Sequence, residues 1–124
     1  MNKKIHKEDV WKIISEHVGE ENAINQDGIT LQCYLRKNYE MSNREIRRLI
    51  RALREEGYPI LSSPHLPNGG YFIPNNYDEA KDWQRRMHIK AIKLLAVVNP
   101  VIKSCQDMFP ERDGIEQLKF KGVG

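Results

Sequence analysis

The sequence predicts an α+β fold that is mainly helical, and three features of the chain support this prediction. Residues 42–56 repeat apolar side chains at helical spacing behind a capping signal. An aromatic and β-branched run follows at once, and prolines and glycines separate it from a second short run, as in a β-hairpin. A long amphipathic pattern from about residue 78 adds a helical extension. The 124 residues suffice for one domain and an appendage.

The first residues of the chain predict a helix from about residue 7 to residue 18. Val10, Ile13 and Ile14 fall on one face at helical spacing. Gly19 is expected to end this helix, because glycine commonly follows a helix C-terminus.

A short strand and a second helix are expected next. Residues 22–25 have the length of a small strand that pairs with the hairpin, and Asp27-Gly28 predicts the turn out of it. Thr30 is then the expected N-cap of a helix that ends near Asn38. The apolar face of this helix is expected to pack inward through Leu31, Tyr34 and Leu35.

The best-defined element is the helix that begins at Ser42. Ser42 and Glu45 form the S-x-x-E capping box, and Met41 lies where a hydrophobic staple would close over the first turn. Gly57 supplies the C-terminal stop. The apolar stripe expected to face the core consists of Ile46, Leu49, Ile50 and Leu53.

The opposite face of this helix is rich in arginine. At about 100° per residue, four arginines fall on that side, and one more arginine and an asparagine lie on its flank. Arginine suits base readout because its planar fork can bind guanine O6 and N7 together. The expected DNA-binding residues are Asn43, Arg44, Arg47, Arg48, Arg51 and Arg54, with Arg44, Arg47 and Arg51 as base readers and Arg48 and Arg54 as phosphate clamps. The alternative is a solvated face on which Glu45, Glu55 and Glu56 neutralise their neighbours.

The hairpin follows this helix without a linker. Residues 58–63 and 71–73 predict its two strands, and residues 64–70 form its tip. An Arg-rich helix that enters such a hairpin suits insertion into the major groove, with the tip along the backbone or minor groove. Because the tip has no Lys or Arg, its candidate DNA contacts are His65 and Asn68.

A family resemblance rests on two runs in this region. The first is Ser-Asn-Arg-Glu-Ile-Arg-Arg-Leu-Ile-Arg-Ala-Leu-Arg-Glu-Glu-Gly-Tyr-Pro-Ile, and the second is Gly-Gly-Tyr-Phe-Ile-Pro. Together they resemble the winged helix-turn-helix DNA-binding domain of the biotin repressor group and of small phage proteins, over roughly Val10 to Pro74. The resemblance implies three helices, a small antiparallel β wing and double-stranded DNA as partner. It also implies a transcriptional regulator or replication-associated factor of a phage or similar mobile element.

The resemblance does not extend past the first 74 residues. The biotin repressor continues into a ligase domain, and residues 75–124 have neither the length nor the motif for one. Ligase activity is therefore not implied. The expected organisation is a winged-helix domain over 1–74, a helical extension over 75–109 and a flexible tail over 110–124.

The extension is expected to begin at Asp78 and Glu79, whose charges suit a helix N-terminus. Asn99-Pro100 is expected to interrupt it, and Pro100 can open a second short helix, giving a hairpin or a kinked rod. Its apolar seam has two readings, packing back on the first domain or homodimerisation. The residues expected to form a dimer interface are Trp83, Met87, Ala91, Leu94 and Val98.

The charge of the chain is modest but uneven. The net charge is +3, and residues 42–56 and 78–124 contribute +2 each. For DNA binding a local cluster of cations matters more than the total, because counterions are released at the contact face. The basic residues of the extension have two readings, a solvated face or added phosphate contacts: Lys81, Arg85, Arg86, Lys90 and Lys93.

The composition favours a cytoplasmic protein, and the family resemblance implies a bacterial cell or a phage-infected host. Cys33 and Cys105 are the two cysteines, and their wide separation fits reduced thiols better than a disulfide framework. The polar N-terminus and the lack of a long apolar run argue against secretion and membrane insertion.

No catalytic constellation is found in the sequence. The four histidines show no H-E-x-x-H or C-x-x-C partner spacing, and the Asn-Gly-Gly run lies between strands and not before a helix. We therefore expect no enzyme activity, no metal and no cofactor. The two function classes that remain are sequence-specific DNA binding and, alternatively, a winged-helix protein-interaction or assembly module without DNA binding.

Overall fold

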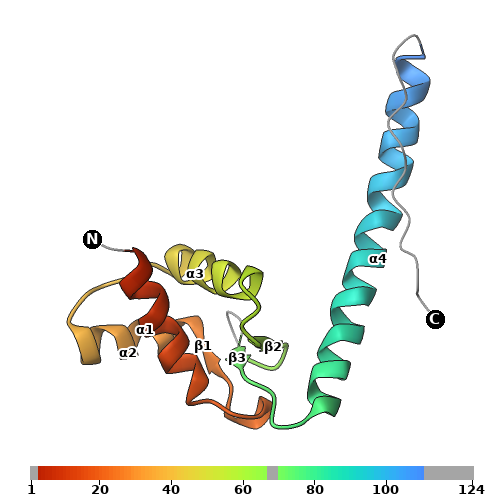
Figure 1. Ribbon diagram of the computed structural model, residues 1–124. Coiled ribbons are helices and arrows are strands. Elements are labelled where there is room, and N and C mark those ends of the chain that lie inside the picture. The colour runs from red at the N-terminus through yellow and green to blue at the C-terminus, as the bar shows by residue number, and fades with distance from the viewer. Residues whose placement is uncertain (1–2, 67–69, 111–124) are drawn as a thin grey trace. The chain divides into compact units, whose positions relative to one another are not determined.

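The computed structural model describes residues 3–66 and 70–110, which are mainly helical with one small antiparallel sheet (Figure 1). The chain divides between Lys81 and Asp82 into two compact units. The first unit holds three helices, a short 3-10 helix and the sheet, and α4 continues from it into the second. The elements are α1 (Lys3–Ser15), η1 (Glu20–Asn22), β1 (Ile24–Asn25), α2 (Gln26–Lys37), α3 (Asn43–Glu55), β2 (Leu61–Ser63), β3 (Gly70–Phe72) and α4 (Tyr77–Met108).

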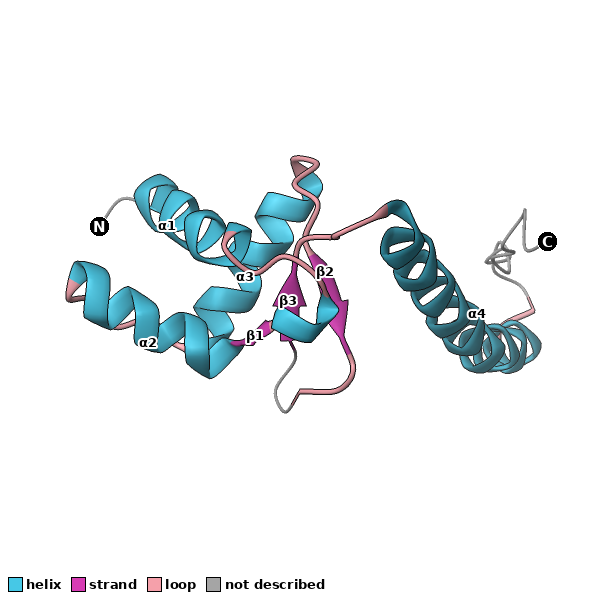
Figure 2. Cartoon of the chain, turned by 90° about the horizontal axis from the view of Figure 1, so that it is seen from below, coloured by secondary structure: helices cyan, strands magenta, loops and turns pink. Residues whose placement is uncertain are grey.

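The sheet places β3 between β1 and β2, and both pairings are antiparallel (Figure 2). Tyr71 lies opposite Ile24 on one side and Ser62 on the other. The first strand of the hairpin is shorter than the sequence predicts, because residues 58–60 are irregular and lie between α3 and β2. The expected strand at residues 22–25 is confirmed at Ile24–Asn25.

The core lies between α1, α2, α3 and the sheet. It is almost entirely aliphatic, and α1 supplies three of its residues at helical spacing, as expected. Burying such side chains from several elements together is the main favourable term in folding. The buried cluster consists of Val10, Ile13, Ile14, Ile29, Cys33, Met41, Ile46, Ile50, Leu53, Ile60 and Tyr71.

The predictions for α3 are confirmed at both ends and on its buried face. The Ser42 hydroxyl accepts a hydrogen bond from the Glu45 backbone N–H at 3.2 Å, as an N-cap does. Gly57 follows the helix with a φ of 94°, and its N–H donates to the Arg54 carbonyl. The buried residues are Ile46, Ile50 and Leu53, with Leu49 partly buried beside them.

The expected end of α1 at Gly19 is wrong, because the helix ends at Ser15. The next residues pair instead with the strand that leaves the sheet. The Gly19 N–H donates to the Ile73 carbonyl at 2.9 Å, and the Ile73 N–H donates to the His17 carbonyl at 2.9 Å. Long-range backbone pairing here replaces the last helical turn that the local pattern favours.

The expected N-cap of α2 at Thr30 is also wrong, because the helix begins at Gln26 and its N-cap lies five residues before Thr30. Asn25 is the N-cap, and its side chain accepts from the Gly28 backbone N–H at 2.8 Å. Asp27 therefore lies in the first helical turn, where its negative charge suits the helix dipole. The end of α2 is as expected, since Asn38 forms a left-handed C-cap with φ 56°.

The expected buried face of α2 is wrong as well. Leu31, Tyr34 and Leu35 are 53%, 50% and 65% exposed. The buried residues are Gln26, Ile29 and Cys33, which follow one another at steps of three and four. This row, and not the more apolar one, is the buried face of α2.

The helical extension is one continuous helix, so the expected interruption at Asn99-Pro100 and the second short helix are wrong. α4 spans 32 residues and Pro100 lies inside it. Proline removes one backbone donor from a helix interior, yet α4 continues through Pro100 as a single helix. The apolar pattern therefore continues along a single helix to Met108.

The start of α4 is fixed by one carboxylate. The Asn76 side chain accepts from the Glu79 backbone N–H at 3.0 Å, while Glu79 Oε1 accepts from the Asn75 N–H at 2.6 Å. Glu79 Oε2 also accepts from the backbone N–H of Glu20, at 2.9 Å. The first turn of α4 is thereby joined to η1, and both lie within the first unit.

Substitution of Gly57 tests how much its positive φ matters for the stability of the junction between α3 and the sheet. A Cβ at Gly57 would meet no atom within 4 Å, so a substitution there acts only through the positive φ. Gly57→Ala is expected to lower the free energy of unfolding by about 1–2 kcal/mol, measured by urea denaturation. Gly57→Asn should lose less, since asparagine tolerates this region better. An unchanged midpoint for Gly57→Ala would contradict this account.

Candidate nucleic-acid interface

Four arginines lie together on the outer face of α3. The helix buries Ile46, Ile50 and Leu53, and the four arginine side chains occupy an arc of about 100° on the opposite side. All four residues are exposed, namely Arg44, Arg47, Arg48 and Arg51. The burial of one face thus determines that the arginine face points to solvent.

The glutamates of this region pair with that face only in part, so the alternative of a self-paired surface is met at one arginine. Of the three, only Glu55 pairs with one of these arginines, with its Oε1 3.1 Å from Arg51 Nε. Glu45 contacts the Ser42 hydroxyl, and Glu56 binds Lys7 Nζ at 2.6 Å. Among the described residues, no ion pair holds Arg44 or Arg48.

The Arg51–Glu55 pair is a weak restraint on Arg51. Both side chains are well exposed, at 84% and 67%. Ion pairs in such positions contribute little, because water screens them and both side chains lose rotamer freedom. A phosphate or a base edge can therefore compete for the Arg51 guanidinium.

Arg47 is held differently, by a residue that sequence reasoning missed. Its Nη1 donates to Gln26 Oε1 at 3.3 Å, and Gln26 Nε2 in turn donates to the Tyr71 hydroxyl at 3.2 Å. Gln26 is only 5% exposed. A chain of hydrogen bonds thus links β3, α2 and α3 and limits the directions that Arg47 can take. The Asn25-x-x-Gly28 spacing at the start of α2 was the signal that could have placed Gln26 on a helix.

Arg54 does not lie with the other arginines. Its Nε donates to the Ile60 carbonyl at 2.9 Å, and its guanidinium carbon lies 5.8 Å from the centre of the Tyr71 ring. Burial lowers the pKa of the Arg54 guanidinium below its ordinary value, while the Coulomb interaction with Tyr71 raises it. Arg54 therefore lies between α3 and the hairpin, and its expected role as a phosphate clamp stays a prediction.

The remaining expected DNA contacts are Asn43 on α3 and two residues of the hairpin tip, His65 and Asn68. The Asn43 amide donates to Asp27 Oδ1 at 3.3 Å, which brings the N-terminal turns of α3 and α2 together. His65 is exposed just after β2, and its backbone N–H donates to the Ser63 hydroxyl. Asn68 lies outside the described residues.

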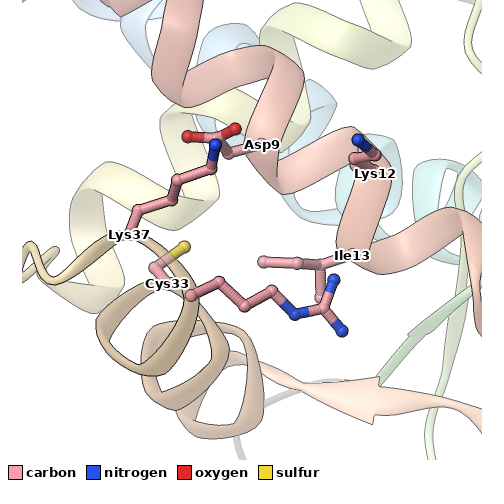
Figure 3. Close-up of a pocket in the computed structure, with 6 residues that line it drawn as sticks. Asp9, Lys12, Ile13, Cys33 and Lys37 are labelled. Carbon is pink, nitrogen blue, oxygen red and sulfur yellow. The ribbon is translucent and has the colours of Figure 1, made fainter.

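A small pocket lies on the first unit between α1 and α2 (Figure 3). Its volume of about 30 Å³ suits one or two water molecules and no larger ligand. Cys33 is one of its lining residues, and burial raises the pKa of this thiol, so the reactive thiolate is disfavoured. The lining residues are Asp9, Lys12, Ile13, Cys33, Arg36 and Lys37, of which Arg36 binds the Glu16 carboxylate through two hydrogen bonds.

Metal sites and membrane-spanning helices were also sought in the described residues. Within residues 3–66 and 70–110, no group of three or more His, Cys, Asp or Glu side chains could hold a metal ion. In the same ranges, every helix is too short or too polar to cross a membrane.

The basic residues of α4 are partly engaged within the helix. Asp82 lies 3.7 Å from Arg85 and 3.3 Å from Arg86, and Lys81 Nζ lies 5.8 Å from the centre of the Tyr77 ring. Lys90 and Lys93 are exposed. These contacts fit a solvated face and leave phosphate contact as an open alternative.

Substitutions of Arg51 and Arg54 compare an exposed arginine of α3 with a partly buried one. Arg54→Ala is expected to lower the free energy of unfolding by about 2 kcal/mol, because it removes a half-buried bond and the packing of the side-chain stem. Arg51→Ala should change it by less than about 0.5 kcal/mol. Chemical denaturation of both variants measures this difference, and equal losses would refute the assignment of Arg54.

No family model matches this chain, and no significant match is found among curated proteins or solved structures.

Proposed function

We propose that this chain is a winged helix-turn-helix protein that binds double-stranded DNA sequence-specifically. α2 and α3 form the helix-turn-helix, α3 is the recognition helix, and β2 and β3 form the wing. The observation that carries the proposal is the group of four exposed arginines on the face of α3 opposite the core. An α-helix fits the major groove, and arginine is the side chain most often used there to read guanine.

Arg44, Arg47 and Arg51 are the proposed base readers, and Arg48 is the proposed phosphate clamp. These residues begin at the second position of α3, and helix-turn-helix proteins contact base edges from this end of the recognition helix. Arg47 is the best oriented of the three, because Gln26 holds it on one side. An oriented guanidinium loses less conformational freedom on binding, which favours discrimination between bases.

The biological role follows from the family resemblance of residues 10–74. A transcriptional regulator or a replication-associated factor of a phage or similar mobile element would both use such a domain. The wing is expected to contribute little electrostatic energy, since the described part of its tip, residues 64–66, holds His65 and no Lys or Arg.

A second candidate function is a protein-interaction module. The exposed Leu31, Tyr34 and Leu35 on α2 favour it, because apolar groups gathered on one helix face often mark a protein interface. Salt separates the two candidates. Binding through several arginine–phosphate contacts weakens steeply as salt rises, whereas binding through an apolar face does not.

A charge-swap pair tests the proposed function directly. Selection from a randomised duplex library should enrich one motif with the intact chain and none with Arg47→Glu/Arg51→Glu. Binding of the selected motif should fall at least about 100-fold in this variant, because two base contacts are lost and two repulsive charges replace them. Lys12→Glu/Lys37→Glu is the matched control, since it makes the same change of charge on α1 and α2 beside the small pocket. Equal losses in both variants, or normal binding by the first, would refute the assigned face.

Gln26 provides a test of how the site discriminates between bases. Gln26→Leu keeps every arginine but removes the acceptor that orients Arg47, so binding to random duplex DNA should change little. Discrimination against single-base changes in the selected motif should fall by about 3–10-fold at the bases that Arg47 reads. Tyr71→Phe keeps the acceptor and should have a smaller effect. Discrimination that is unaltered in Gln26→Leu would show that the hydrogen bond has no part in readout.

A further inference from the structure

The second unit leaves large apolar side chains in water. No residue of α4 is buried in the described part of the chain. Leu94, Val97, Val101 and Met108 are 63%, 64%, 55% and 70% exposed. At 100° per residue these four side chains fall within about 60° of one another, so they form one stripe along the helix.

The stripe follows a seven-residue repeat, which is visible only because α4 continues past Pro100. Positions 80, 87, 94, 101 and 108 are all apolar, and they have the spacing of the first core position of a coiled coil. The second core position lies three residues later. It is apolar at Trp83 and Val97 and polar at Lys90 and Ser104. A strict seven-residue repeat over four heptads is typical of two helices wound around each other.

We propose that the chain forms a homodimer in which the α4 helices of two copies pack antiparallel along this stripe. The proposal does not depend on DNA binding by the first unit. Ala91 and Val98, which the sequence pattern favoured for the seam, flank it one position away from the core. The residues that form the interface are Trp83, Met87, Leu94, Val97, Val101 and Met108.

Lys90 determines the orientation, because it occupies a core position of the repeat. In a parallel pair the two Lys90 side chains would meet in one layer, where like charges repel at short range. In an antiparallel pair with Leu94 facing Val97 of the partner subunit, Lys90 faces the partner's Val101. The two lysines are then about 16 Å apart along the axis, since 11 residues of helix separate their layers.

The same register also gives Met87 and Trp83 suitable partners. Met87 faces the partner's Ser104, and Trp83 faces the partner's Met108, so a large side chain is paired with a smaller or flexible one. Beside the core, Arg86 comes opposite Asp107 of the partner subunit, and the two-fold axis makes this ion pair twice. In a parallel pair, Arg86 would come opposite the partner's Ala91, without a charge.

The mass of the full chain in solution tests the pairing. Sedimentation equilibrium should give twice the monomer mass of 14.5 kDa. Leu94→Asp should raise the dimer dissociation constant at least about 100-fold, because it places a carboxylate in the central layer of both copies. Ile89→Asp is the matched control, since Ile89 is also exposed but lies about 140° round the helix from Leu94. A monomer at every concentration, a larger oligomer, or equal effects of the two variants would overturn the proposal.

Cysteine pairing tests the orientation in a Cys105→Ser background. Antiparallel packing brings position 87 next to the partner's position 104. A mixture of Met87→Cys and Ser104→Cys chains should therefore form a mixed disulfide on oxidation, and neither variant alone should, because identical positions lie about 26 Å apart. Parallel packing would reverse this result, with each variant linking to itself, and would overturn the orientation.

Discussion

The burial of one face of α3 is the constraint on which the rest of the first unit depends. Ile46, Ile50 and Leu53 enter a core that α1, α2 and the sheet enclose, so the rotation of α3 about its axis is fixed. A shift of one residue would turn a buried isoleucine by about 100° into water and bring an arginine into the core. Such a shift would lose the free energy of apolar burial and would add the cost of burying an unpaired charge. The exposed arginine face is therefore a consequence of core packing.

The two arginines at the edge of that face connect it to the other elements. Arg47 donates to Gln26 on α2, and the Gln26 amide donates in turn to the Tyr71 hydroxyl on β3. Arg54 donates to the Ile60 carbonyl beside the hairpin and lies over the Tyr71 ring. Tyr71 is itself part of the buried cluster. Hydrogen bonds to other elements therefore restrain the proposed recognition face on this flank, whereas Arg44 and Arg48 on the other side keep the rotamer freedom of exposed side chains.

The elements that the sequence predicts well are those whose signals are local. The cap at Ser42, the stop at Gly57 and the stripe between them all lie within α3. The start of α2 could not be chosen this way, because Asn25 and Thr30 are both good caps and the pairing of Ile24 with Tyr71 decides between them. Arg54 and Arg47 differ by only about 20° on a helical wheel, so only the tertiary surroundings separate an inward side chain from an outward one. At Pro100 the expectation that an interior proline ends a helix is wrong, because α4 continues through this residue.

The lack of packing around Arg44, Arg48 and Arg51 has an evolutionary consequence. These side chains contribute nothing to the buried cluster, so their replacement carries almost no penalty in folding. If α3 reads DNA as proposed, target preference can drift at these three positions while the scaffold stays intact. Arg47 is different, because a replacement there also leaves the buried amide of Gln26 short of a partner. A lineage of such proteins would then diversify its binding sites from one side of the helix and keep the other side constant.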